Sequence, residues 1–577
     1  MLPSAAAQTR PNRAEAQLQQ AMRDYEQILR EADPITAGQD GDRAALRRLP
    51  DVRPETLTAR RAQLQAIHNR LTRIDASRLS GDGPLNHALL VEATAMAAEE
   101  LGYDFERIAF ENDSGFYDLM DYVARTTTIA TRDDADAWIA RLEALPAFYE
   151  QNFANMRRGI ATHFTQPRIV IDRVMSVART IAAQAPEESS LLLPFADLPA
   201  TIPAAEQEAY RARALAIVRD QIKPKERAFA QFLETDYLPA ARAQISWRSL
   251  PDGEASYRFL VRRETTTQMS PDEIHQLGLS EVARIRGLME DTIRETGFTG
   301  TFAEFLHFLR TDPQFYAQTA DDLLEKAAEI AKRADDRLPP LFGTLPRLPY
   351  GVRAVPAEVA EGYTTARYWP GSPILGQAGG YMVNTSHLDQ RPLYEFPALT
   401  LHEAVPGHHL QIALSQELSE LPYFRRNAFY TAYVEGWGLY AEFLGEEMDM
   451  YRTPYERFGR YSMEMWRACR LVADTGIHWM GWDIEQARRC FTENSALAPH
   501  NIQTELERYI SWPGQALAYK IGELRMRAMR REAEATLGEH FNVRQFHDAM
   551  LLGGALPIDV LETRVRTWVA AQQHPAN

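Results

Sequence analysis

A histidine followed directly by a glutamate, with two more histidines shortly after, is the feature of this sequence that most clearly indicates chemistry. His402 and Glu403 lie in an apolar segment that begins at Phe396, and His408 and His409 follow a Pro-Gly pair. Neutral imidazoles bind Zn²⁺ well, and a carboxylate beside a ligand can take a proton from a metal-activated water. The pattern therefore predicts the metal ligands and general base of a zinc hydrolase.

The spacing of the second ligand departs from the usual arrangement, in which it lies four residues after the first. That position is Pro406, which cannot bind a metal. On a regular helix His408 would lie about 600° beyond His402 and face away, whereas His409 would share its face about 10 Å away. Pro406 lacks an N–H and Gly407 tolerates unusual dihedral angles, so we expect the helix to bulge and turn His408 back toward His402. His408 is the predicted second ligand, and His409 is the alternative.

A third ligand is expected from a second helix. Glu435 lies among aromatic and aliphatic residues in a predicted helix over 425–443, where an unpaired acid would be costly to bury. Its separation of 33 residues from His402 fits a helix, a turn and an antiparallel return helix. The structural alternative for Glu435 is a buried salt bridge. Glu442, on the same helix face, is either a competing ligand or a carboxylate that orients a histidine.

These residues resemble a known set. HEAVPGHHLQ, starting at His402, and YVEGWGLYAE, starting at Tyr433, are similar to a large bacterial family catalogued as a domain of unknown function. Its members carry an HExxxGHH-type motif and are considered metallopeptidase-like. The resemblance is strongest over residues 363–522. More distantly the chain resembles the gluzincin zinc peptidases, which include angiotensin-converting enzyme, helical carboxypeptidases and dipeptidyl peptidase III.

The resemblance implies a gluzincin-like helical unit with a deep cleft. It implies that His402, His408 and Glu435 hold Zn²⁺ and that Glu403 is the general base. Dipeptidyl peptidase III has one extra residue between its histidine ligands, whereas this chain has two. The segment 381–385 precedes the His-Glu helix, and gluzincins hold extended substrate against a strand in that position. An ordinary edge strand is the alternative for this segment.

Two groups of polar residues downstream are candidates for stabilising a developing oxyanion. Gln515 and Tyr519 lie four residues apart on one face of a helix that starts at Pro513-Gly514, and a tyrosine hydroxyl can donate to an oxyanion. The resemblance favours Tyr519 for this role over simple core packing. His478 is the second candidate. It shares a helical face with two other residues, and a buried ion network is the alternative for these three: Arg470, Asp474 and His478.

The elements that must position these residues are mainly helices. Apolar stripes at helical spacing occur early in the chain, at Leu18, Met22, Tyr25 and Leu29 and again at Leu64, Ile67 and Leu71. The segment 255–265 is predicted to be a strand because it alternates and is β-branched. Ser270 to Glu273 predicts a capped helix start. Seven prolines exclude regular helix over 339–373, a short strand follows at 379–385, and helices resume at Phe396.

We therefore expect a mainly α fold, a large helical catalytic unit with a small antiparallel strand element. Residues 1–254 would form a helical N-terminal scaffold and residues 255–577 the metal-binding catalytic part, both within one continuous domain. The 577 residues carry a net charge of −16, which disfavours binding to nucleic acids. No apolar run is long enough to span a membrane. The sequence leaves the oligomeric state open.

Two features bear on the cellular compartment. Cys469 and Cys490 are too few for a disulfide framework, and each is expected to be a small buried hydrophobic residue. The N-terminus has neither a basic nor an apolar signal region, but the segment 5–8 resembles the end of a signal peptide. A cytoplasmic protein and a periplasmic or secreted one trimmed at a cleavage site are both consistent with this terminus.

The sequence thus predicts a zinc-dependent hydrolase of amide bonds, with a short peptide or small amide as substrate. Glu403 would take a proton from the attacking water and pass it to the leaving amine. Tyr519 or His478 would polarise the scissile carbonyl together with the metal. A hydrolase of non-peptide amides or esters and a non-catalytic metal-binding scaffold are the alternatives.

Overall fold

The first helices of the chain begin and end where their sequence requires. The computed structural model describes residues 12–112, 114–360, 363–373 and 376–573, so the signal-like segment 5–8 lies outside the described residues. Asn12 accepts a hydrogen bond from the backbone N–H of Glu15 and caps α1 (Arg13–Ala32). In the predicted stripes Leu18 and Tyr25 are buried, as are all three of the later residues, whereas Met22 and Leu29 are partly exposed.

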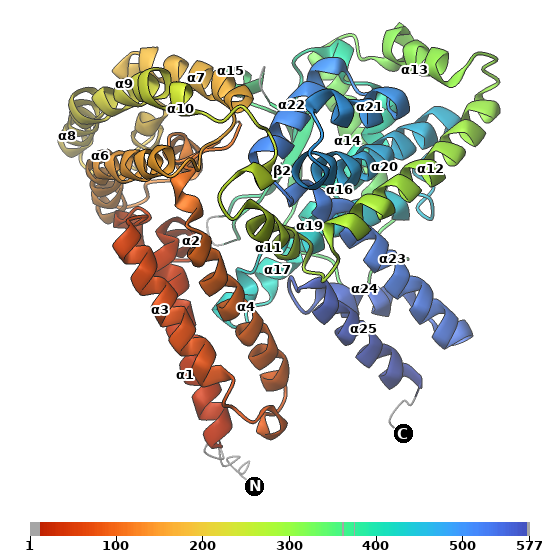
Figure 1. The fold of residues 1–577 in the computed structure, drawn as a ribbon, viewed down its shortest axis with the longest axis horizontal. Helices are drawn as coiled ribbons and strands as arrows, with labels where there is room; N and C mark the ends of the chain where they lie inside the picture. The colour runs from red at the N-terminus through yellow and green to blue at the C-terminus, as the bar shows by residue number, and fades with distance from the viewer. Residues whose placement is uncertain (1–11, 113, 361–362, 374–375, 574–577) are drawn as a thin grey trace. The chain divides into compact units, whose positions relative to one another are not determined.

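The chain divides into two compact units, Met1–Gln244 and Ile245–Asn577, ten residues before the boundary expected from the sequence. In the first unit α1, α3 and α4 lie side by side (Figure 1). The helices of this unit are α1, α2 (Pro34–Gln39), α3 (Pro54–Leu71), α4 (Gly83–Tyr103), α5 (Leu119–Thr126), α6 (Arg132–Ala161), α7 (Arg168–Ala183), α8 (Ala204–Ile217), α9 (Lys223–Phe232) and α10 (Leu238–Ala240).

The second unit contains the predicted site and is also mainly helical. Its helices before and within the proline-rich segment are α11 (Gly253–Thr265), α12 (Pro271–Thr296), α13 (Phe302–Thr311), α14 (Ala320–Asp336) and the short α15 (Ala357–Ala360). Those that follow are α16 (Phe396–Glu403), α17 (His408–Glu417), α18 (Tyr423–Arg426), α19 (Thr431–Leu444), α20 (Pro454–Thr475), α21 (Ile484–Asn494), α22 (Pro499–Ser511), α23 (Ala518–Leu537), α24 (Val543–Leu551) and α25 (Ile558–Gln573). The prediction of a mainly α fold is confirmed.

The strand element is a three-stranded sheet, and it is mixed rather than antiparallel. Its order is β1 (Tyr350–Ala354), β3 (Gly379–Val383) and β2 (Ala366–Trp369). β3 pairs with β1 in parallel, with Tyr350 opposite Gly379, and with β2 antiparallel, with Tyr368 opposite Tyr381. The predicted strand at 379–385 is thus confirmed as β3. It is central and buried at every position.

The predicted strand at 255–265 is wrong, because this segment forms α11. Its buried residues recur at helical spacing, as in Tyr257, Leu260, Val261 and Glu264. The apparent alternation came from the arginines between them, and the 3.6-residue period decides the structure. The predicted helix start at Ser270 is confirmed, since its hydroxyl and the Glu273 carboxylate form a capping box at the start of α12.

The cysteines also differ from expectation. Cys469 of α20 and Cys490 of α21 form a disulfide. The sequence did not predict this bond, because two cysteines were considered only as too few for a framework of several disulfides.

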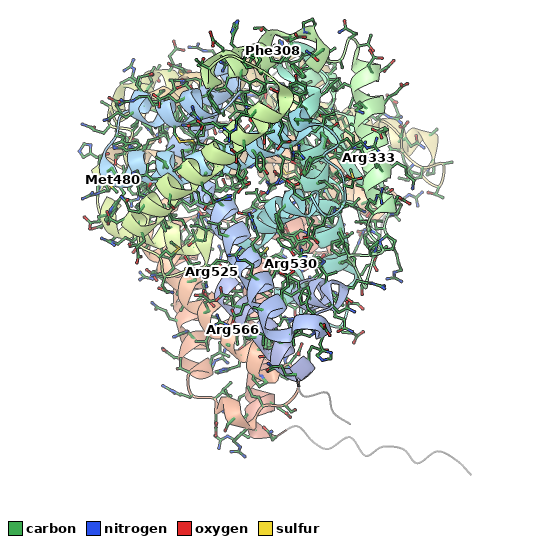
Figure 2. The ribbon with its side chains drawn as sticks, turned by 90° about the vertical axis from the view of Figure 1, so that its right-hand side faces the viewer. Phe308, Arg333, Met480, Arg525, Arg530 and Arg566 are labelled. Carbon is green, nitrogen blue, oxygen red and sulfur yellow. A yellow bond between two sulfur atoms is a disulfide. The ribbon has the colours of Figure 1, made fainter. Side chains whose placement is uncertain are left out.

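Ion pairs join the C-terminal helices α23 and α25. Arg525 pairs with Glu562 and Arg566 pairs with Glu532, and Figure 2 labels both arginines. Among the described residues, no helix is long and apolar enough to cross a membrane.

Candidate metal centre

The Pro-Gly pair ends one helix and allows the next to begin in a new direction. α16 ends at Glu403 and α17 begins at His408, so the expected bulge is a complete break. The Trp437 indole N–H donates to the carbonyl of Pro406 at 2.8 Å and ties the break to α19. A Cβ on Gly407 would lie 1.9 Å from the carbonyl oxygen of His402, so only glycine fits this close approach.

This break places His408 beside His402, with ring centroids 4.6 Å apart. The Glu435 carboxylate from α19 completes the group, and one ligand atom from each of the three residues lies within 4.8 Å of the others. Glu435 Oε2 is 3.4 Å from Nε2 of each histidine. Tetrahedral ligands 2.0–2.1 Å from one zinc ion would be separated by about 3.3 Å, so the spacing fits zinc.

Two polar atoms of this group are buried without a hydrogen-bond partner. Glu435 Oε2 and His408 Nδ1 have no hydrogen-bond partner, and a buried polar group without a partner is costly. His402 and His408 are buried, and the Glu435 side chain is 16% exposed. A cation bound by two imidazoles and one carboxylate would satisfy Glu435 Oε2, and the two-nitrogen, one-oxygen set is one that zinc accepts.

Glu442 lies behind His402 rather than within the group. Its Oε1 is 2.9 Å from His402 Nδ1, which leaves Nε2 of His402 directed toward Glu435. Arg467 of α20 lies 3.6 Å from the same carboxylate oxygen. A carboxylate that accepts from the far nitrogen of a ligand histidine fixes its tautomer and its orientation. The geometry therefore matches the orienting alternative for Glu442.

Carboxylates dominate the charge around His402. Burial lowers the pKa of His402, but contacts with Glu435 and Glu442 and the charge of Glu403 outweigh it and raise the pKa to about 9. Burial raises the pKa of Glu435, but the neighbouring His408 and His402 outweigh it and hold the pKa well below its usual range. The group therefore favours a positive charge at its centre, which a divalent cation would supply.

Glu403 lies at the end of α16, next to His402. Its side chain is buried, and its Oε2 accepts a hydrogen bond of 2.8 Å from the backbone N–H of Tyr368 in β2. This leaves Oε1 for another partner. A carboxylate that is fixed in this way can accept a proton in a defined direction.

His409 faces away from the group, toward the sheet. Its Nδ1 is 3.0 Å from the Tyr368 hydroxyl. Burial lowers the pKa of His409 to about 4, so its ring is neutral. Among the described residues, the group that could hold a metal contains His408 and not His409.

The expectation that substrate pairs with the strand at 381–385 is wrong. β3 is the central strand, and both of its edges are already paired, with β1 and with β2. The Asn384 side chain donates to the carbonyl of Ala360 and so holds the neighbouring loop. The sheet edge that reaches the site is β2, and there the outward amide of Tyr368 is bonded to Glu403.

His478 has both ring nitrogens bonded to the backbone. Nδ1 accepts from the N–H of Trp247 at 3.0 Å, and Nε2 donates to the carbonyl of Tyr509 at 2.9 Å. The side chain is fully buried. These bonds argue against the predicted role of His478 as a donor to substrate and favour the structural alternative.

The three residues expected to form one ion network have separate partners. Arg470 binds Glu505 at 3.0 Å. Asp474 accepts from the Tyr257 hydroxyl at 2.6 Å and from the N–H of Gly514 at 3.0 Å. Burial raises the pKa of Asp474 to about 7.

Tyr519 lies in the first turn of α23, with its hydroxyl 3.4 Å from the Gln515 amide nitrogen. α23 crosses α19 closely, because a Cβ on Gly436 would lie 2.6 Å from the backbone of Gly522. Gly436, which lies at this crossing, directly follows Glu435 in α19. Tyr519 lies about one turn before Gly522 in α23.

Two contributors to the site were missed from the sequence. Gly438 packs against the face of His402, where an added Cβ would lie 2.6 Å from the imidazole. Its position three residues after Glu435, on the same helix face, is a signal that could have been used. Tyr368 reaches Glu403 through its backbone, and no side-chain pattern could have indicated that contact.

Comparisons with known proteins identify the family to which the chain belongs. A family model described as "Bacterial protein of unknown function (DUF885)" matches residues 34–565. No curated protein matches the chain. A structure described as "the putative lipoprotein from Colwellia psychrerythraea" is 27% identical, with a TM-score of 0.90 over 96% of this chain and 99% of that chain. A second, described as "a putative lipoprotein of unknown function from Shewanella oneidensis", has 18% identity and a TM-score of 0.70, covers 95% and 99% of the two chains, and shows the same fold.

Proposed function

This chain belongs to the bacterial DUF885 family of unknown function, and we propose that it is a zinc-dependent hydrolase of amide bonds acting on short peptides. The observation that carries the proposal is the group of His402, His408 and Glu435 directly beside Glu403. Its donor atoms are buried and converge on one point, and the adjacent carboxylate keeps one oxygen without a bond to β2. The arrangement supports a gluzincin-like site.

Each residue of the chain has a distinct part in this proposal. His402, His408 and Glu435 would hold Zn²⁺, which acts as a Lewis acid on a carbonyl and makes water a stronger nucleophile. Glu403 would accept the proton of the attacking water at Oε1 while the Tyr368 amide holds Oε2. The same carboxyl group would then give the proton to the leaving amine. Glu442 would keep His402 in the tautomer that directs Nε2 toward Glu435.

Tyr519 is the proposed donor to the oxyanion of the tetrahedral intermediate. Its position one turn before the crossing of α23 with α19, close to Glu435 in the sequence of α19, supports this role. A hydroxyl aimed at a developing oxyanion contributes most where water is excluded. Substrates would be short because we propose that they reach the site through a cleft between helices.

A panel of substrates tests the proposal. Purified protein should contain zinc and hydrolyse short peptides, and a chelator should abolish the hydrolysis until zinc is restored. Peptides with free and blocked ends, and small non-peptide amides and esters, belong in the same panel. Hydrolysis of the small molecules alone would replace the peptide substrate, and protein that binds no zinc would contradict the whole proposal.

We also propose that the protein works outside the cytoplasm. The relative from Colwellia psychrerythraea is described as a putative lipoprotein, and the Cys469–Cys490 disulfide fits an oxidising compartment. Thiol titration of protein purified from its native cells without reductant should find both cysteines oxidised. Two free thiols would contradict this location.

A further inference from the structure

One side chain of α17 contacts all three strands of the sheet. The His409 ring lies against the ring of Tyr350 in β1, with centroids 4.6 Å apart. Its Nδ1 is 3.0 Å from the Tyr368 hydroxyl of β2. On β3, a Cβ added to Gly379 would lie 3.0 Å from the same nitrogen. His409 therefore fastens the sheet to the helix that begins with His408.

The hydrogen bonds of His409 determine which atom donates and which accepts in its contact with Tyr368. The ring donates to the backbone of Leu348, which precedes β1, so Nδ1 is the acceptor and the Tyr368 hydroxyl donates to it. The Tyr368 hydroxyl in turn accepts from the backbone N–H of Gly371. This one hydroxyl therefore links β2 to α17 and to the loop that follows β2.

The same tyrosine touches the proposed general base. The backbone N–H of Tyr368 donates to Glu403 Oε2 at 2.8 Å, while its hydroxyl is held by His409. We propose that His409 is a positioning residue that aligns Glu403 by fixing Tyr368 of β2. The two adjacent histidines then serve different groups, His408 the metal ligands and His409 the base. This inference rests on the proposed function.

The energetic basis is the short pairing of β2. It is a four-residue strand that, among the residues the structure describes, pairs only with β3, and few hydrogen bonds restrain such a strand. If β2 shifts, Glu403 loses the amide that selects Oε1 for proton transfer. A misplacement of about 1 Å can reduce a rate by about 10². Fixing β2 thus affects the rate of proton transfer more than the binding of metal or substrate.

Variants of both partners test the inference. In His409→Ala we expect zinc content to remain near wild type, kcat to fall about tenfold and KM to change less than about twofold. Hydrogen exchange of the backbone amides over 363–370 should become faster. Tyr368→Phe, which removes the hydroxyl but keeps the amide, should reproduce these effects. The double variant should add little to either single change.

His409→Asn provides a rescue, because its side-chain oxygen can replace Nδ1 as an acceptor and should restore much of kcat. Tyr440→Phe is a matched control, since the Tyr440 hydroxyl also lies 2.9 Å from a buried histidine, His547. This control should change neither kcat nor exchange over 363–370.

Several results would overturn the inference. Loss of zinc in His409→Ala would assign His409 to the metal. Unchanged exchange over 363–370 would show that His409 does not hold β2, whatever the activity. Wild-type kcat in His409→Ala, despite faster exchange, would remove the link to Glu403. A wild-type protein that binds zinc but hydrolyses nothing would instead overturn the proposed function. The hydrogen-exchange data would still show whether His409 restrains β2.

Discussion

The second unit contains two buried histidine and carboxylate clusters that look alike in the sequence but differ in how their polar atoms are bonded. At the α16–α17–α19 junction, His408 Nδ1 and Glu435 Oε2 are buried without a hydrogen-bond partner. On α20 and the helical turn that follows it, both nitrogens of His478 and both oxygens of Asp474 are bonded to fixed neighbours. An unpaired carboxylate oxygen that faces two imidazole nitrogens, as Glu435 Oε2 does, indicates a ligand, whereas fully paired groups indicate a structural role.

The largest expected effect is a loss of hydrolysis. It is expected at the α16–α17–α19 junction and not at the cluster of His478 and Asp474. Glu403→Gln should lower kcat by about 10² or more, because an amide cannot accept the proton of the attacking water. Zinc content and the unfolding transition should stay near wild type. Steady-state kinetics on the best peptide and metal analysis provide the test. A variant with wild-type kcat would remove Glu403 from the mechanism.

Metal affinity should distinguish a ligand from the residue that orients one. Glu435→Ala should lose zinc, since it removes a ligand, whereas Glu442→Ala should weaken zinc binding by about 10- to 100-fold. Titration against a competing chelator measures both. If Glu442→Ala loses more zinc than Glu435→Ala, the two roles must be exchanged.

A glycine substitution tests whether the fit around His402 matters. Gly438→Ala should strengthen α19 by up to about 1 kcal/mol in helix propensity, yet its methyl would displace the His402 ring and weaken zinc binding. Gly287→Ala in α12 is the matched control, because a Cβ there meets nothing within 4 Å. Equal zinc affinity in the two variants would show that the ring can move freely.

The smallest expected effect on zinc binding and hydrolysis is at the structural cluster, where the change is in stability. Burial raises the pKa of Asp474 from its usual 3.8 to about 7, so the folded protein keeps this proton over a range in which the unfolded chain has lost it. The stabilisation is complete below pH 3.8 and is lost as pH rises through 7.

Asp474→Asn lacks this titration. The unfolding free energy of wild type relative to the variant should therefore fall by about 1.4 kcal/mol per pH unit between pH 4 and 7. Denaturant unfolding at several pH values measures the difference, and zinc content should be unchanged. A difference independent of pH would mean that Asp474 is ionised in the folded protein.

The sequence was most informative where a local pattern determines structure. Helical stripes, the Ser270 capping box and the Pro-Gly break between His402 and His408 all act within one or two turns. The prediction failed at 255–265, where two local patterns compete. Arginines between the buried residues of this helix gave the alternation that is typical of a strand. Pairings between distant segments, such as Tyr368 with Glu403 or Cys469 with Cys490, depend on tertiary packing.

Zinc content of three proteins, measured by mass spectrometry after gel filtration, tests the central claim most directly. Wild type should carry one zinc ion per chain. His408→Ala should carry far less, because it removes one of three ligands, and His409→Ala should carry nearly as much as wild type, because its ring faces the sheet. Wild-type protein that cannot be loaded with zinc, or loss of zinc in His409→Ala but not in His408→Ala, would contradict the account.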